Sequence, residues 1–122
     1  MTMVTTSLTV EIDGEPYDGR LGTIKKTSLG REDHGIPTAN IDIDFGGSNQ
    51  GAGNYGLQGE AMFVFVQGVL DTLKVRDWES LPGTKVIALY APNSHYPIKG
   101  LMLAVGGEPI LFEQAFKAAG IE

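Results

Sequence analysis

Residues 60–75 are the one stretch of this sequence whose pattern indicates a long helix, and they constrain the fold more than any other feature. The polar residues in this stretch form a single narrow stripe at helical spacing, and the other positions are apolar or glycine. The stripe consists of Glu60, Gln67, Asp71 and Lys74. A helix of this kind buries more than one face, so it needs a sheet on one side and further cover, expected from a second subunit, on the other.

Strand patterns precede and follow this helix. The clearest is at residues 37–45, where Ala39, Ile41 and Ile43 alternate with polar residues. Further strands are expected at residues 7–12, 21–29, 84–91, 98–105 and 110–112, with a helical turn at residues 113–119. Gly19 and Gly30 are expected to bound the second strand. The chain is predicted to be an α+β domain, with an antiparallel sheet of five or six strands packed on one main helix.

Composition narrows the function classes. The 122 residues, 42% of them hydrophobic, suit a single domain spanning residues 1–122. A net charge of -6 disfavours duplex nucleic acid as a partner. The lack of cysteine excludes disulfides, thiolate metal sites and a cysteine nucleophile. Without an apolar segment of membrane-spanning length or a signal-like N-terminus, we expect a soluble cytoplasmic protein that does not contact membranes.

A glycine run at residues 46–59 directly follows the clearest strand and is expected to form a long structured loop. Glycine lets backbone amides approach an anion, and Ser, Asn and Gln add neutral hydrogen-bond donors. The run lacks the lysine of a phosphate-binding loop and a βαβ context, so a flexible or oligomer-lining loop is the alternative. Its candidate ligand-binding residues are Gly46, Gly47, Ser48, Asn49, Gln50, Asn54 and Tyr55.

Charged residues also cluster between two expected strands, at residues 29–38. The candidate ligand-binding residues of this cluster are Arg31, Glu32, Asp33, His34 and Thr38. A histidine beside carboxylates could act as a general base or a metal ligand. The alternative is a capped turn, because no second histidine lies at ligand spacing.

Three smaller features carry open alternatives. Asp42 and Asp44 share a strand face and could bind a divalent cation with a neighbouring carboxylate, or form an ordinary solvated face. His95 is a secondary ligand-binding candidate, in a loop whose tyrosines could stack on a base or cover the end of the sheet. Trp78 is expected to be a buried apolar plug in the connector after the helix. Basic residues concentrate at Arg20, Lys25, Lys26 and Arg31, upstream of the glycine run.

Three motifs within residues 29–83 resemble small phage-encoded proteins of unassigned function. They are Leu-Gly-Arg-Glu-Asp-His-Gly-Ile-Pro-Thr at residues 29–38, the glycine run with its flanks at residues 44–57, and Trp-Glu-Ser-Leu-Pro-Gly at residues 78–83. Asn49, Ala52 and Asn54 depart from the Gly-Gly-Ser-Gly-Gln-Gly-Phe-Gly-Gly-Tyr pattern of those proteins. The resemblance implies a phage or prophage accessory protein in the host bacterial cytoplasm. Small phage proteins of this kind include sponges, often homo-oligomers, that sequester nucleotide signals of bacterial immunity without cleaving them.

The leading prediction is therefore a homo-oligomeric binding protein. In it, the glycine run and the Glu-Asp-His-Gly segment at residues 32–35 form a pocket for a nucleotide or cyclic-nucleotide signal, with no catalytic residue, metal or cofactor assigned. One alternative is a metal-dependent phosphodiester or nucleotide hydrolase that uses His34 as its base, with the metal held by Glu32, Asp33, Asp42 or Asp44. A second alternative is an acidic protein that blocks a host protein partner.

Overall fold

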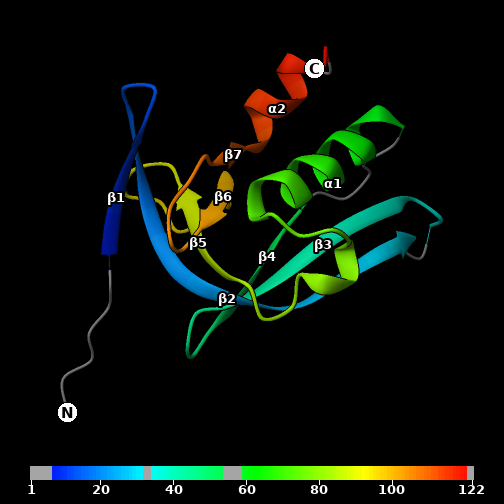
Figure 1. Cartoon of the computed structure of the whole chain (residues 1–122), viewed down its shortest axis with the longest axis horizontal. Coiled ribbons are helices and arrows are strands. Elements are labelled where there is room, and N and C mark those ends of the chain that lie inside the picture. Colours follow the sequence, from blue (N-terminus) through cyan, green and yellow to red (C-terminus); the bar gives the residue numbers. More distant parts are fainter. Residues whose placement is uncertain (1–6, 32–33, 54–58, 121–122) are drawn as a thin grey trace.

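The computed structural model describes residues 7–31, 34–53 and 59–120, and these form one antiparallel sheet with helices on one face (Figure 1). The strands are β1 (Ser7–Ile12), β2 (Glu15–Arg31), β3 (Pro37–Asp44), β4 (Asn49–Ala52), β5 (Lys85–Tyr90), β6 (Gly100–Leu103) and β7 (Ile110–Leu111). The helices are α1 (Glu60–Leu73), the short 3-10 helix η1 (Trp78–Ser80) and α2 (Phe112–Ala118). The predicted α+β class is confirmed, with seven strands and a second helix beyond the main one.

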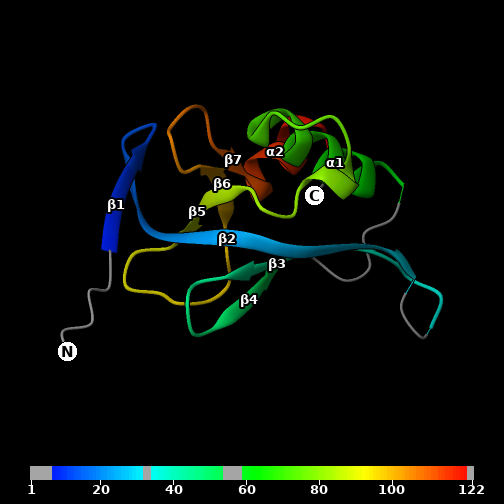
Figure 2. The same ribbon diagram turned by 60° about the horizontal axis from the view of Figure 1, so that its bottom comes forward.

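The long strand β2 organises the sheet, whose order is β4-β3-β2-β5-β6-β7. Its first part pairs with β1, where Arg20 lies opposite Ser7, and its second part pairs with β3, where Thr23 lies opposite Asp44. Residues 18–23 pair with β5. The register with β3 shifts between Ile24 and Lys26, and such irregularities increase strand twist. β2 accordingly follows a strongly curved path across the molecule (Figures 1 and 2).

The expected end points of this strand, Gly19 and Gly30, are wrong, because β2 continues through both glycines. Gly19 serves close packing instead. A Cβ atom there would lie 2.9 Å from Ile87 Cγ2, and one at Gly22 would lie 2.7 Å from Ile43 Cγ2. A glycine within a strand can therefore mark a close approach by a neighbour rather than a break in the strand.

The main core lies between the sheet and the two helices (Figure 2). Helix α1 contributes Phe65, Val69 and Leu73, and its predicted polar stripe is exposed. Phe65 contacts Phe112 of α2, with ring centroids 5.1 Å apart. Helix α2 thus supplies part of the cover that the sequence had led us to expect from another subunit. One large apolar side chain of α1, Phe63, stays 65% exposed, and the homo-oligomer remains a prediction.

A second apolar cluster lies on the opposite face of the sheet. Ile87, Leu89 and Leu111 are buried there, and side chains of β1 pack against them. The central strand β5 is therefore covered on both faces, as its continuous apolar sequence predicts. Neither α1 nor α2, the helices of the described part of the chain, is long and apolar enough to cross a membrane.

Candidate functional site

The glycine run, expected to be a loop throughout, contains the edge strand β4. Its first residues make the turn from β3: Gly46 has a φ of 88° and its amide donates to Asp44 Oδ1 at 2.8 Å. The strand then pairs with β3, where Ala52 lies opposite Ile41 and is 2% exposed. Ladder hydrogen bonds and this burial offset the backbone entropy that glycine loses on becoming ordered.

Gln50 joins β4 to the loop that follows β5. Its side-chain oxygen accepts a hydrogen bond from the Tyr90 hydroxyl at 2.5 Å, and its amide nitrogen donates to the His95 carbonyl at 3.1 Å. Gln50 lies opposite Ile43 in the register, so its side chain is on the core face of the sheet. This pair of contacts holds the edge strand against the loop at residues 91–99.

Arg20 completes the polar network beside Gln50. Its guanidinium carbon lies 4.2 Å from the centre of the Phe45 ring, and Nη2 donates to Ser48 Oγ at 3.1 Å. Burial raises the pKa of the Tyr90 phenol above its ordinary value, while the nearby Arg20 charge opposes that rise. Tyr90 therefore stays protonated at neutral pH and keeps its hydrogen-bond donor.

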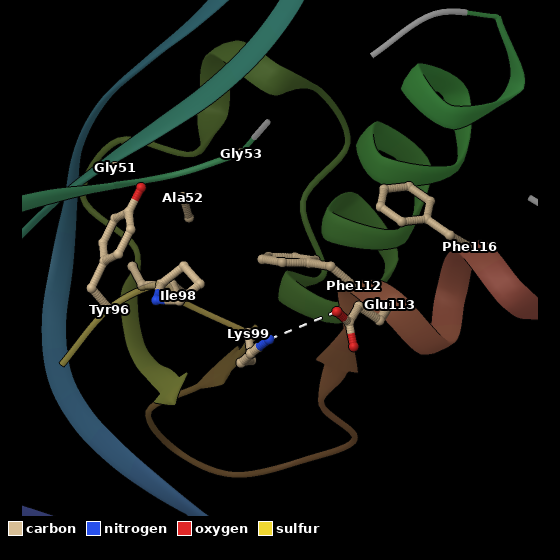
Figure 3. A pocket seen from close by; sticks show the side chains of 10 residues that line it. Gly51, Ala52, Gly53, Tyr96, Ile98, Lys99, Phe112, Glu113 and Phe116 are labelled. Carbon is tan, nitrogen blue, oxygen red and sulfur yellow. Dashed lines mark ion pairs between the residues drawn. The ribbon is translucent and has the colours of Figure 1, made fainter. Parts of the chain in front are cut away.

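A groove of about 220 Å³, here called the edge-strand groove, opens between β4, residues 96–99 and α2 (Figure 3). Tyr96 lies on one side of it and Phe116 on the other, with the backbone of Gly51 and Gly53 above. Lys99 and Glu113 close the opposite end, and their Nζ and Oε1 atoms are 3.7 Å apart.

The chemistry of the groove suits a ligand with an aromatic ring and an anionic group. The Tyr96 ring is 73% exposed and available for stacking. Lys99 is 36% exposed and Glu113 75% exposed, and such ion pairs stabilise a fold by about 1 kcal/mol or less. An anionic ligand can therefore replace Glu113 beside Lys99. β4 is a terminal strand and has no side chain at Gly51, which leaves its backbone open to close approach.

The candidate residues of the glycine run fall into separate places. Ser48 and Gln50 belong to the Arg20–Tyr90 network, and Gln50 also contacts the backbone of His95. Gly46 and Gly47 form the β3–β4 turn, with φ angles of 88° and 153°. Asn49 lies opposite Asp44 on the outer face and directs its amide toward Asp42. Asn54 and Tyr55 lie outside the described residues.

The second candidate cluster lies further along β3. Ile43 is the register partner of Gln50, and Thr38 is five positions before Ile43 in β3. Thr38 is therefore roughly 17 Å away from that point along the strand. Arg31 and His34 are exposed near the end of the β2–β3 hairpin, at which Arg31 lies opposite Pro37. The structure thus brings none of these three to the groove. Glu32 and Asp33 lie outside the described residues.

The acidic residues suggested for a metal site are engaged in the β3–β4 connection. Asp44 accepts the Gly46 amide, and Asp42 accepts from Asn49 at 3.5 Å. Within residues 7–31, 34–53 and 59–120, no group of three or more His, Asp or Glu side chains is close enough to hold a metal ion.

Sequence reasoning missed the residues that form the groove. Lys99 and Glu113 are 14 positions apart, and no local motif links them. Phe112 and Phe116 on α2 have helical spacing, which predicts a shared face but not its neighbour. The sequence came closest to indicating Tyr96, because it is an aromatic residue next to the candidate ligand-binding residue His95. Comparisons with protein-family models, curated proteins and solved structures found no match, so the proposed function depends on the chemistry of the groove itself.

Proposed function

We propose that this protein binds a nucleotide-type ligand in the edge-strand groove and holds it without converting it chemically. The observation that carries the proposal is the meeting, in one groove, of bare glycine backbone, an exposed aromatic ring and a lysine. Aromatic rings stack on bases, positively charged side chains contact phosphates, and bare glycine backbone permits the close approach of a ligand.

Each part of such a ligand has a counterpart in the groove. A base stacks on the exposed Tyr96 ring, and Phe116 limits the opposite side. A phosphate pairs with Lys99 after Glu113 moves aside into solvent. Gly51 in the edge strand β4 and Gly53 directly after it line the groove without side chains of their own, so a ligand can approach the backbone closely.

The biological role that we propose is sequestration of a nucleotide signal by a phage accessory protein. It draws on the resemblance of residues 29–38, 44–57 and 78–83 to small phage proteins and on the acidic, cysteine-free composition. In this role the protein is a homo-oligomer, and the exposed Phe63 is the apolar side chain of α1 available for a contact between copies. Light scattering at high micromolar concentration should report particles larger than 13 kDa, whereas monomers alone would contradict the oligomer.

The hydrolase alternative has less support from the described residues. It requires His34 and nearby carboxylates to act together, yet Asp42 and Asp44 accept hydrogen bonds within the β3–β4 connection. No observation favours the third possibility, a surface that blocks a host protein.

The test is a thermal-shift screen of the common ribonucleoside monophosphates and dinucleotides, followed by calorimetric titration. A ligand at one hundred times its dissociation constant adds about 2.7 kcal/mol of stability. Lys99→Gln should weaken binding by about tenfold, since it removes a charge-assisted hydrogen bond. Glu113→Gln should strengthen binding, because it removes the carboxylate that competes with the phosphate for Lys99.

Two matched controls separate the groove from general effects. Lys85→Gln makes the same charge change at an exposed position that does not line the groove. Phe63→Ala removes an exposed aromatic ring from α1, whereas Tyr96→Ala removes one from the groove. The proposal fails if no nucleotide raises the melting temperature, or if Lys99→Gln and Tyr96→Ala bind as well as their controls.

A further inference from the structure

A second pocket adjoins the edge-strand groove. This hairpin pocket has a volume of about 340 Å³ and lies between the start of β2 in the β1–β2 hairpin, residues 91–92 and α2. Its lining includes Glu15, Tyr17, Lys99, Glu113 and Lys117. Lys99 and Glu113 also line the edge-strand groove, so this ion pair is the common wall of the two spaces.

We propose that the two pockets form one two-lobed site for a dinucleotide, with a base in each lobe and the connecting phosphate on Lys99. The inference rests on the proposed function and specifies its ligand class. The feature that carries it is the position of the single lysine shared by both lobes.

The sizes of the lobes favour a ligand that occupies both. Pockets for drug-sized ligands usually measure about 300–1,000 Å³. The edge-strand groove, at about 220 Å³, is below this range, and the hairpin pocket, at about 340 Å³, barely reaches it. The two together are well within the range, which favours a ligand that spans both over one confined to the groove.

Lys99 is held firmly at the junction by its own backbone. Its amide donates to the Leu89 carbonyl at 2.6 Å, and its carbonyl accepts from the Phe112 amide at 3.0 Å. The residue is thereby fixed between β5 and the start of α2, directly before β6. A cation anchored at this point can contact a phosphate that bridges the two lobes.

Different residues of the short helix α2 line the two lobes. Phe112 and Phe116 line the edge-strand groove, while Lys117 lines the hairpin pocket and Glu113 lines both. Positions four apart share a face of a helix, so each of these pairs is presented on one side of α2. Lys117 adds a second cation and Tyr17 an aromatic ring to the hairpin pocket, and Glu15 offers a carboxylate to the N–H groups of a base.

The experiment is calorimetric titration with each ribonucleoside monophosphate and with the matching linear homodinucleotide. The dinucleotide should bind one per chain and at least about tenfold more tightly than its monophosphate, because the second base binds intramolecularly. Lys117→Gln should remove most of that gain and leave monophosphate binding unchanged. Lys117 is exposed, so the substitution does not disturb the core, and Lys85→Gln is the matched control.

The outcomes separate this inference from the function on which it rests. Equal affinity for both ligands, with no effect of Lys117→Gln, overturns the two-lobed site. If monophosphate binding is still weakened by Lys99→Gln in that case, the proposed function stands. If neither ligand binds the parent protein, the proposed function fails, and the dinucleotide site fails with it.

Discussion

The Tyr90 hydroxyl donates a hydrogen bond to Gln50 Oε1, and this contact joins β5 to the edge strand β4. Two strands, β3 and β2, lie between β4 and β5 in the sheet. In a flat sheet, backbones three strand spacings apart are about 14 Å from each other. The side chains meet because β2 curves (Figure 1), and the same curvature brings β4 beside residues 96–99 to form the groove.

Tyr90 should make the stability of the protein depend on pH under alkaline conditions. Burial raises the pKa of its phenol in the folded state above the ordinary phenol value of 10.0. The folded protein therefore retains this proton more firmly than the unfolded chain. The free energy of unfolding that this difference contributes is present below pH 10 and is lost as the pH rises through the folded pKa. The melting temperature should fall more steeply above pH 10 in the parent than in Tyr90→Phe.

Tyr96→Phe is the matched control for that measurement, because it removes the hydroxyl of a side chain that is 73% exposed. It shows the effect of removing a phenol hydroxyl outside the Tyr90–Gln50 contact. At neutral pH, Tyr90→Phe should itself cost about 0.5–1.5 kcal/mol, since Gln50 loses a hydrogen-bond donor. Identical alkaline slopes for the parent and Tyr90→Phe would show that the phenol is not desolvated.

Trp78→Ala should destabilise the fold by about 3–5 kcal/mol. The Trp78 ring is 5% exposed and lies 6.1 Å from the Phe65 ring, centroid to centroid. Its Nε1 atom also donates to the Ser28 carbonyl at 3.3 Å, which holds the connector after α1 against β2. Urea unfolding followed by circular dichroism measures the loss, and unchanged unfolding midpoints would place the ring in solvent.

Two glycines of β2 should respond in opposite ways to alanine. A Cβ at Gly22 would lie 2.7 Å from Ile43 Cγ2 and 2.8 Å from Phe45 Cδ1, so Gly22→Ala should cost about 1–3 kcal/mol through overpacking. Nothing lies within 4 Å of a Cβ at Gly30, where alanine should stabilise by up to about 1 kcal/mol. Chemical denaturation of both variants tests the pair, and equal effects would contradict the packing at Gly22.

Gly47→Val should weaken the fold without changing the groove. Gly47 has a φ of 153° in the β3–β4 turn, and a side chain there strains the backbone by roughly 1–3 kcal/mol. Since Gly47 does not line the edge-strand groove, the folded fraction should bind its nucleotide with the affinity of the parent. Titration below the melting temperature checks this, and a loss of affinity would extend the site to the turn.

Local patterns predicted the elements whose residues alternate clearly. Residues 37–45 gave β3 almost to the residue, and the polar stripe of residues 60–75 placed α1 on its correct face. The antiparallel arrangement of the sheet was predicted too, and β5 and β6 pair in this way. The wrong expectations concern glycine. Reading Gly19 and Gly30 as strand breakers, and the run at residues 46–59 as a loop on grounds of backbone entropy, takes no account of close packing and strand pairing.

The sequence by itself determined the α+β class, the buried faces of β3 and α1 and the burial of Trp78, because hydrophobic periodicity acts over a few neighbouring residues. Tertiary structure alone decided that Gly51 and Gly53 lie beside Tyr96, Lys99 and Phe116. Gly51 belongs to β4 and Gly53 directly follows it, whereas Tyr96 and Lys99 lie in the loop before β6, and Phe116 belongs to α2. Their meeting depends on the curvature of β2 and on the Tyr90–Gln50–His95 contacts, which no local pattern encodes.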